Sequence, residues 1–169
     1  MKIYLLVNVF FIFLCITLLN LESKAQPNFI CNCVEIQKHK KATNIDWCSD
    51  ANLSESKRME IIECLLESKG DKTPFLGVVI NNYVSQTFGP SPFEVVALFH
   101  ISYLFYGKKD FADAMVLVND EDEEQNSNRS IKIAYKAYKK WFKKVKKVGF
   151  EEARKQKLDP LIGSGVSWY

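Results

Sequence analysis

Cysteines are the residues whose type and spacing most clearly suggest chemistry in this chain. Of the five, Cys15 lies in the apolar N-terminal segment, and the other four are Cys31, Cys33, Cys48 and Cys64. The apolar N-terminal segment predicts export, and an even number of cysteines in an exported chain predicts two disulfides. Cys31 and Cys33 are the least favourable pair, because closing so small a ring strains the bond. Two pairings therefore stay open, and both connect Cys48 and Cys64 to the N-terminal segment.

Zinc binding is the alternative for the same thiols, with His39 as a further ligand. Zinc sites usually present paired thiols of the form C-x2-C, whereas this chain has only C-x-C, downstream of a secretory signal. Disulfides are therefore preferred, and we predict neither a metal site nor another cofactor. Each bridge would contribute about 2 to 4 kcal/mol of stability.

The histidines give little sign of an active site. Nucleophilic hydrolysis needs a base beside the nucleophile, and the chain has two histidines. His39 lies among lysines, and His100 lies in an apolar stretch, where a packed core residue is the more common role. Residues 163–165 read GSG but lack the five-residue G-x-S-x-G pattern and a preceding strand. We therefore predict no catalytic residue and a protein that is not an enzyme.

Acidic residues 120–124, DEDEE, are candidate calcium ligands. They lack the glycine and the alternating ligands of a calcium-binding loop. A solvated linker between two helices is therefore the preferred interpretation. Its negative charges precede a strongly basic segment and can partly neutralise it.

That basic segment, residues 135–147, reads YKAYKKWFKKVKK. Apolar residues recur there at intervals of four and three, which predicts an amphipathic helix with an almost purely cationic outer face. The apolar stripe comprises Ile131, Tyr135, Tyr138, Phe142, Val145 and Gly149, widened by Ala134, Trp141 and Val148. The lysines on the remaining surface are Lys132, Lys136, Lys139, Lys140, Lys143, Lys144, Lys146 and Lys147.

Three interpretations of this lysine face stay open. The lysines can serve solubility alone, their stems covering nearby apolar surface. They can instead bind an anionic partner such as a sulfated glycan, a polyphosphate, a phospholipid head group or an acidic protein face. Lysine rather than arginine indicates diffuse attraction. Membrane insertion, the third, needs the stripe to leave the fold. The candidate anion-binding residues are Lys136, Lys139, Lys140, Lys143, Lys144, Lys146 and Lys147.

The N-terminal 25 residues predict export. A charged start leads into an apolar run from Tyr4 to Leu19, and the small residues Ser23 and Ala25 precede a cleavage point. An uncleaved signal anchor is the alternative. Cleavage leaves one secreted domain, residues 26–169, with no membrane span. Export also permits N-glycosylation at the sequons of Asn52 and Asn128.

The charge of the mature domain is nearly balanced. The signal removes two lysines and one glutamate from 23 basic and 20 acidic residues, leaving a net charge of +2. Such a balance argues against nucleic acid as the chief partner, so the pattern of charge carries more information than its total.

Helix start and stop residues recur at helical distances along the domain. Asn52 with Glu55 is typical of a capping box, and Gly70 of the stop of the same helix. Thr73-Pro74 is typical of a cap followed by proline at the first helical position. A further start at residues 91–94, SPFE, leads into an apolar helix that Gly107 ends.

This apolar helix, residues 92–106, is too short to span a bilayer and is predicted to be the central core helix. The other predicted helices cover residues 33–41, 110–118, 127 or 128 to 148, and 150–158. We therefore expect an all-α fold, a compact bundle of six or seven short helices held by two disulfides. Trp168 and Tyr169 are expected to dock the C-terminal tail onto it.

The combination of features resembles a known group of proteins. A secreted chain of this size carries Ile30-Cys31-Asn32-Cys33 near the mature start, with Cys48 and Cys64 completing two bridges and several helices following. It is similar in architecture to the small disulfide-bonded salivary proteins of blood-feeding insects, nearest to the anopheline anophensin and albicin group. The odorant-binding-like folds of insects are a competing resemblance, but they generally use six cysteines.

The salivary resemblance implies a helical, non-enzymatic inhibitor of host defence that binds host proteins of complement or the kallikrein-kinin contact system. We therefore expect a secreted binding protein whose partner is an extracellular host protein or a sulfated or phosphorylated polyanion. A carrier of small hydrophobic ligands is the alternative, with a pocket lined by Phe88, Phe93, Phe99, Tyr103 and Phe105. A cationic membrane-active defence protein is a second alternative.

Overall fold

A computed structural model of the chain describes residues 53–75, 90–107, 112, 114–119, 121 and 124–169. Several predictions lie outside the described residues: the signal segment 1–25, three of the four cysteines predicted to form disulfides, the helix at 33–41 and the sequon at Asn52. The described part is mostly helical, with four α-helices, a 3-10 turn and two short strands. The elements are α3 (Glu55–Leu65), η1 (Leu66–Ser68), α5 (Phe93–Tyr106), β1 (Leu117–Asn119), α6 (Asn128–Val148), α7 (Phe150–Lys155) and β2 (Val166–Trp168).

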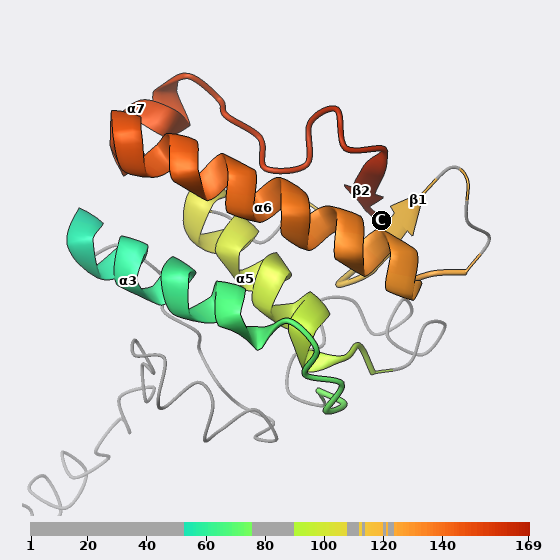
Figure 1. Ribbon diagram of the computed structural model, residues 1–169. Coiled ribbons are helices and arrows are strands. Elements are labelled where there is room, and N and C mark those ends of the chain that lie inside the picture. Colours follow the sequence, from blue (N-terminus) through green and yellow to red (C-terminus); the bar gives the residue numbers. More distant parts are fainter. Residues whose placement is uncertain (1–52, 76–89, 108–111, 113, 120, 122–123) are drawn as a thin grey trace, which may run out of the picture.

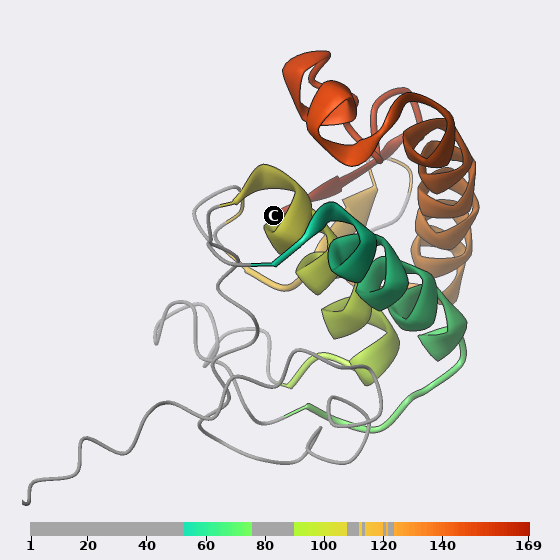
Figure 2. The same ribbon diagram turned by 90° about the vertical axis from the view of Figure 1, so that its left-hand side faces the viewer.

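Helix α5 forms the centre of the described fold. Every residue of α5 except Tyr106 is buried, because its sequence is apolar nearly all round. It contacts α3, α6 and α7, and α3 and α6 run alongside it (Figures 1 and 2). Gly107 ends α5 with φ of +70°, the left-handed conformation that glycine adopts without strain. The predicted core helix and its stop are confirmed.

The start of α5 differs from the predicted capping box. Pro92 is the capping residue, and the hydroxyl of Ser91 instead donates a hydrogen bond of 2.6 Å to the backbone oxygen of Met115. Glu94 accepts a 2.6 Å bond from the backbone N–H of Gly70 and pairs with Lys72. The side chains of Ser91 and Glu94, predicted to cap the helix, therefore bond to distant segments of the chain.

The start and the end of α3 also differ from those predicted. Ser54, not Asn52, is the capping residue, and its hydroxyl accepts a 3.3 Å bond from Lys57 N–H. Glu55 reaches across to the backbone N–H of Phe150, at 2.6 Å, and so joins α3 to the start of α7. α3 ends at Leu65 and η1 at Ser68, both before the predicted stop at Gly70, which has φ of +89°.

A helix was also predicted to begin at Thr73-Pro74. Pro74 instead forms an isolated bridge with Pro92, and the Phe75 N–H donates a 3.0 Å bond to the Ser91 carbonyl. Extended pairing with the entry to α5 thus replaces the first helical turn.

Residues 117–119 form a strand where a helix was predicted. β1 pairs antiparallel with β2, and Leu117 lies opposite Trp168. Hydrogen bonds between Tyr169 and the backbone of Ala114 and Val116 extend this pairing. The fold is therefore not purely α, and the tail is docked as expected. The ring of Trp168 lies edge-on to Phe99 at a centroid separation of 5.3 Å.

Helix α6 is held against the core by the predicted stripe. The buried stripe residues of α6 are Ile131, Ala134, Tyr135, Tyr138, Trp141, Phe142 and Val145. Val148, by contrast, is 41% exposed, so the stripe does not extend to it. Gly149 ends the helix as predicted, with φ of +91°. The shorter α7 follows, ending at Lys155 instead of near Leu158.

Hydroxyl groups fix α6 at two further points. Tyr135 donates a 2.9 Å bond to the backbone oxygen of Glu94. The hydroxyl of Tyr138 is hydrogen-bonded to Ser102 and accepts a 3.0 Å bond from the indole N–H of Trp168. Burial raises the pKa of both tyrosines well above its ordinary value, so both remain neutral. These bonds set the rotation of α6 about its axis.

Candidate functional site

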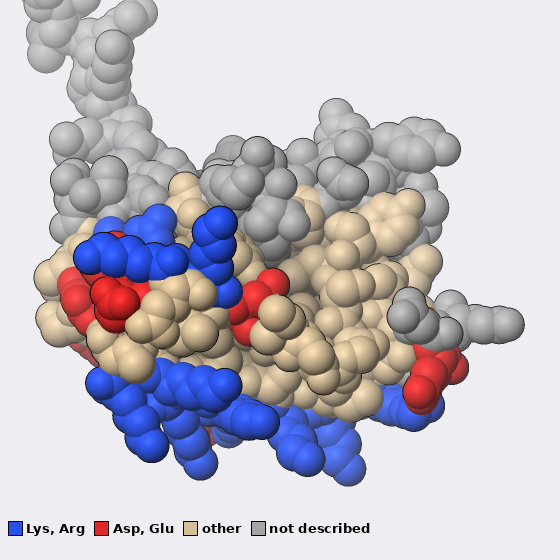
Figure 3. All heavy atoms as spheres, turned by 90° about the horizontal axis from the view of Figure 1, so that it is seen from above, with Lys and Arg blue, Asp and Glu red and all other residues tan. Residues whose placement is uncertain are grey.

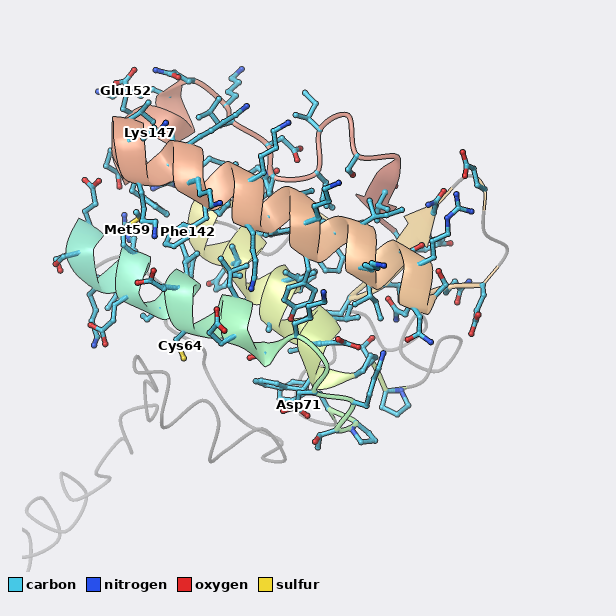
Figure 4. The ribbon with its side chains drawn as sticks, in the orientation of Figure 1. Met59, Cys64, Asp71, Phe142, Lys147 and Glu152 are labelled. Atoms are coloured by element: carbon cyan, nitrogen blue, oxygen red, sulfur yellow. The ribbon has the colours of Figure 1, made fainter. Side chains whose placement is uncertain are left out.

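The outer face of α6 carries the candidate site. Ser127 caps the helix by accepting a 3.1 Å bond from Ser130 N–H, and the buried stripe then fixes which side chains point outward. All eight lysines of α6 are exposed. Figure 3 shows Lys and Arg side chains gathered in a row along one edge of the molecule. Figure 4 shows the opposite orientation for Phe142, which points from α6 toward α3 and Met59.

Two of these lysines are paired with acids, one on α3 and one on the 3-10 turn η1 that follows it. Lys146 Nζ lies 3.1 Å from Glu63 and also over the ring of Phe142. Lys139 Nζ lies 3.7 Å from Glu67. Exposed pairs of this kind contribute about 0 to 1 kcal/mol, so they shape the local charge more than the stability. Lys139 and Lys146, both predicted as site residues, are therefore partly neutralised.

Glu63 and Glu67 were not predicted as partners of these lysines. Their spacing is a usable signal, because residues four apart in a helical segment lie on the same face and can form one acidic edge. The local sequence does not show, however, that Glu63 of α3 and Glu67 of η1 lie beside α6.

The remaining six lysines of α6 have no carboxylate partner among the described residues. They lie on the part of the helix surface farthest from the buried stripe. Four of them follow one another at intervals of four, three and four residues, which places them in one line along the axis. We call this line the lysine ladder; its members are Lys136, Lys140, Lys143 and Lys147. Lys132 and Lys144 flank it.

Other cations of the described chain contrast with the ladder. The three arginines all contact carboxylates: Arg58 and Arg154 contact Glu151, and Arg129 contacts Glu121. Three lysines outside α6 do the same, Lys57 with Glu60, Lys72 with Glu94, and Lys155 with Glu152. Within the described residues, Lys69 and Lys157 are the remaining lysines outside α6 without such a partner. Unneutralised positive charge is thus concentrated on the outer face of α6.

The exposed lysines give this face the chemistry to attract anions. Each ammonium group offers three hydrogen-bond donors and no acceptor, on a flexible stem. Like charges one helical turn apart repel, and each such pair costs a few tenths of a kcal/mol. An approaching anion relieves that repulsion, and the buried stripe keeps the lysines in register while it does so.

The other predicted residues occupy structural positions. His100 is buried on α5, 9% exposed, with its ring 6.3 Å from that of Tyr103, as expected for a core residue. Asn128 is the first residue of α6, and its side-chain oxygen accepts a 2.9 Å bond from Lys72. Glu121 of the acidic run pairs with Arg129.

Cys64 is the one cysteine among the described residues. Its side chain points from α3 on the side away from α6 (Figure 4), and it is disulfide-bonded. The partner lies outside the described residues, so the pairing and the number of bridges remain predictions.

No group of three or more histidine, cysteine or acidic side chains is arranged to hold a metal ion in the residues that the structure describes. None of the helices in the same residues is long and apolar enough to cross a membrane.

Comparisons with protein-family models, with curated proteins and with solved structures gave no match to this chain. Its function is therefore argued from the lysine face itself.

Proposed function

We propose that this protein is a secreted, non-enzymatic binding protein that takes an anionic extracellular partner on the outer face of α6. One observation carries the proposal: six exposed lysines without a carboxylate partner in the described chain lie on a helix whose rotation is fixed by its buried side. Such a surface presents positive charge in a constant arrangement, which is what recognition of an anion requires.

Solubility alone is a weaker explanation of the same face. A mixture of signs would keep the surface soluble with less repulsion, and the chain uses such mixtures on α3 and α7. Along the ladder, by contrast, lysines continue for about three helical turns with no acidic residue between them. A surface that retains repulsion in the free protein is best explained by a partner that removes it.

The wider proposal includes the parts of the chain that the structure leaves undescribed. We propose cleavage of residues 1–25, and six or seven helices held by two disulfides in the mature domain. Together with the resemblance to salivary proteins, this favours an inhibitor of host defence whose target belongs to complement or to the contact system. Its partner would then be an acidic face of a host protein or a sulfated or phosphorylated polyanion.

The two alternatives receive less support from the contacts of α5 and α6. A membrane-active helix would have to remove Tyr138 and Trp141, both buried, from the core. The aromatic residues proposed to line a carrier pocket pack against other rings: Phe93 lies 6.2 Å from Phe75, and Phe105 lies 5.0 Å from Trp141. A filled aromatic core therefore explains them better than a ligand cavity; Phe88 lies outside the described residues.

Replacement of the four ladder lysines by glutamine tests the proposal. We expect the affinity for heparin, measured by calorimetry at low salt, to fall roughly 10- to 100-fold, because four charge contacts worth up to about 1 kcal/mol each are lost. The dependence of affinity on salt should weaken in parallel, since fewer counterions are released.

The matched control removes the same charge elsewhere. Its four substitutions to glutamine are at Lys57, Lys69, Lys155 and Lys157. We expect this control to keep most of the affinity. Equal losses in the two variants would show that net charge, not the face of α6, governs binding, and the proposed site would be wrong.

A further inference from the structure

We infer that the partner on this face is a linear polyanion that lies lengthwise along α6, a polymer of sulfate or phosphate groups, and not a compact anion. The inference rests on the proposed function and deepens it by naming the shape of the ligand. Three observations carry it: the straight line of the ladder, its length, and the acidic side chains beside it.

The ladder is longer than a compact anion. Its first and last rungs are separated by 11 residue steps, which is about 16 Å along the helix axis. Neighbouring rungs are one turn apart, with Cβ atoms about 5 to 6 Å from each other. A single phosphate or sulfate group can therefore bridge two adjacent rungs but leaves the others uncompensated. A chain with anionic groups repeated along its length reaches all four.

Acidic side chains border the ladder on one side. Glu63 and Glu67 hold Lys146 and Lys139 on the flank that faces α3, and both glutamates are exposed, at 66% and 78%. A polyanion turned across the helix onto α3 would meet these carboxylates. Repulsion on this side and attraction along the ladder direct the polymer parallel to the axis of α6.

Lysine is the suitable cation for such a ligand. Arginine would favour bidentate recognition of one carboxylate or phosphate, whereas a lysine ammonium attracts any anionic oxygen without a fixed geometry. The ladder contains no arginine. Arg129, in the first turn of α6, pairs with Glu121. The face is thus suited to repeated charge and tolerant of the exact spacing between anionic groups.

The test compares ligands of different length and shape on the intact secreted chain. The linear probes are heparin di-, tetra-, hexa- and octasaccharides, together with linear polyphosphate of matched charge; the compact probe is inositol hexakisphosphate. We expect affinity to rise with oligosaccharide length until all four rungs are engaged. The octasaccharide should then bind about tenfold more tightly than the hexakisphosphate, because one or two further lysine contacts are made.

The outcomes separate this inference from the proposed function. If the hexakisphosphate binds as tightly as the octasaccharide, and both lose affinity in the ladder variant, the site stands but the linear ligand is wrong. If no probe depends on the ladder, both are wrong. Affinity that rises with oligosaccharide length supports the inference, and the tighter binder of heparin and polyphosphate shows whether the face prefers sulfate or phosphate groups.

A second variant tests the path of the polymer beside α3. Glu63→Gln with Glu67→Gln removes the two bordering charges and releases Lys139 and Lys146, so the affinity for the octasaccharide should rise about 3- to 10-fold. The control, Glu60→Gln with Glu152→Gln, removes the same charge but frees Lys57 of α3 and Lys155 of α7, neither of which belongs to α6. An equal rise in both variants would contradict the lengthwise path.

Discussion

Replacement of Phe105 by alanine is expected to lower the free energy of unfolding by about 3 to 5 kcal/mol. Phe105 is 2% exposed near the end of α5. Its ring meets Trp141 of α6 and Phe150 of α7 edge-on, with centroid separations of 5.0 and 5.7 Å. One side chain thus joins three helices, and its removal leaves a cavity that none of them can fill alone.

Urea denaturation followed by circular dichroism measures this loss. Since small domains are stable by only about 5 to 15 kcal/mol, Phe105→Leu is a milder second variant, with an expected loss of about 1 to 2 kcal/mol. Ile162→Ala is the control, because Ile162 is 81% exposed and should change stability by less than about 0.5 kcal/mol. A Phe105→Ala variant as stable as this control would contradict the described core.

Replacement of Tyr138 by phenylalanine, which removes a single oxygen, is expected to lower the free energy of unfolding by about 1 to 3 kcal/mol. The hydroxyl is completely buried and joins Ser102 of α5 to the indole N–H of Trp168 in β2. Tyr138→Phe keeps the ring but removes the hydroxyl to which Ser102 and Trp168 are hydrogen-bonded. Tyr169→Phe is the matched control, because Tyr169 is 50% exposed. Equal midpoints of urea unfolding for the two variants would be evidence against the buried network.

The same substitution has a consequence at high pH. Burial raises the pKa of Tyr138 in the folded protein above the ordinary value of 10.0, so its stabilising effect is present below that pH and is lost as the pH rises above it. Tyr138→Phe should therefore weaken the alkaline loss of stability. The affinity of the folded variant for heparin should not change, because Tyr138 lies on the side of α6 opposite the ladder.

Sequence patterns were sufficient for α5 and α6 because these helices depend on local properties. The apolar run of α5 and the four-three spacing of α6 determine which side of each is buried, and glycines at 107 and 149 end them. The exposed lysines followed directly from the same spacing. Val148, the last residue of α6, departs from the pattern and is 41% exposed.

The errors have a common physical cause, which is pairing between residues far apart in sequence. Ser91 bonds to Met115, and Glu94 bonds to Gly70, so neither is available for the local cap. The strand at 117–119 exists because the C-terminal tail pairs with it. Likewise, the division of the lysines into paired and unpaired sets depends on where α3 packs, which the spacing within α6 does not specify.

Lysine-selective NMR during a titration with heparin octasaccharide tests the central claim most directly. Reductive dimethylation with 13C-formaldehyde labels each lysine and keeps its charge. We expect the largest shifts at Lys136, Lys140, Lys143 and Lys147, with smaller ones at Lys139 and Lys146. Lys69 and Lys157, which also lack a described partner, should change little. Shifts that are largest at these two lysines, or equal across all of them, would contradict a binding face on α6.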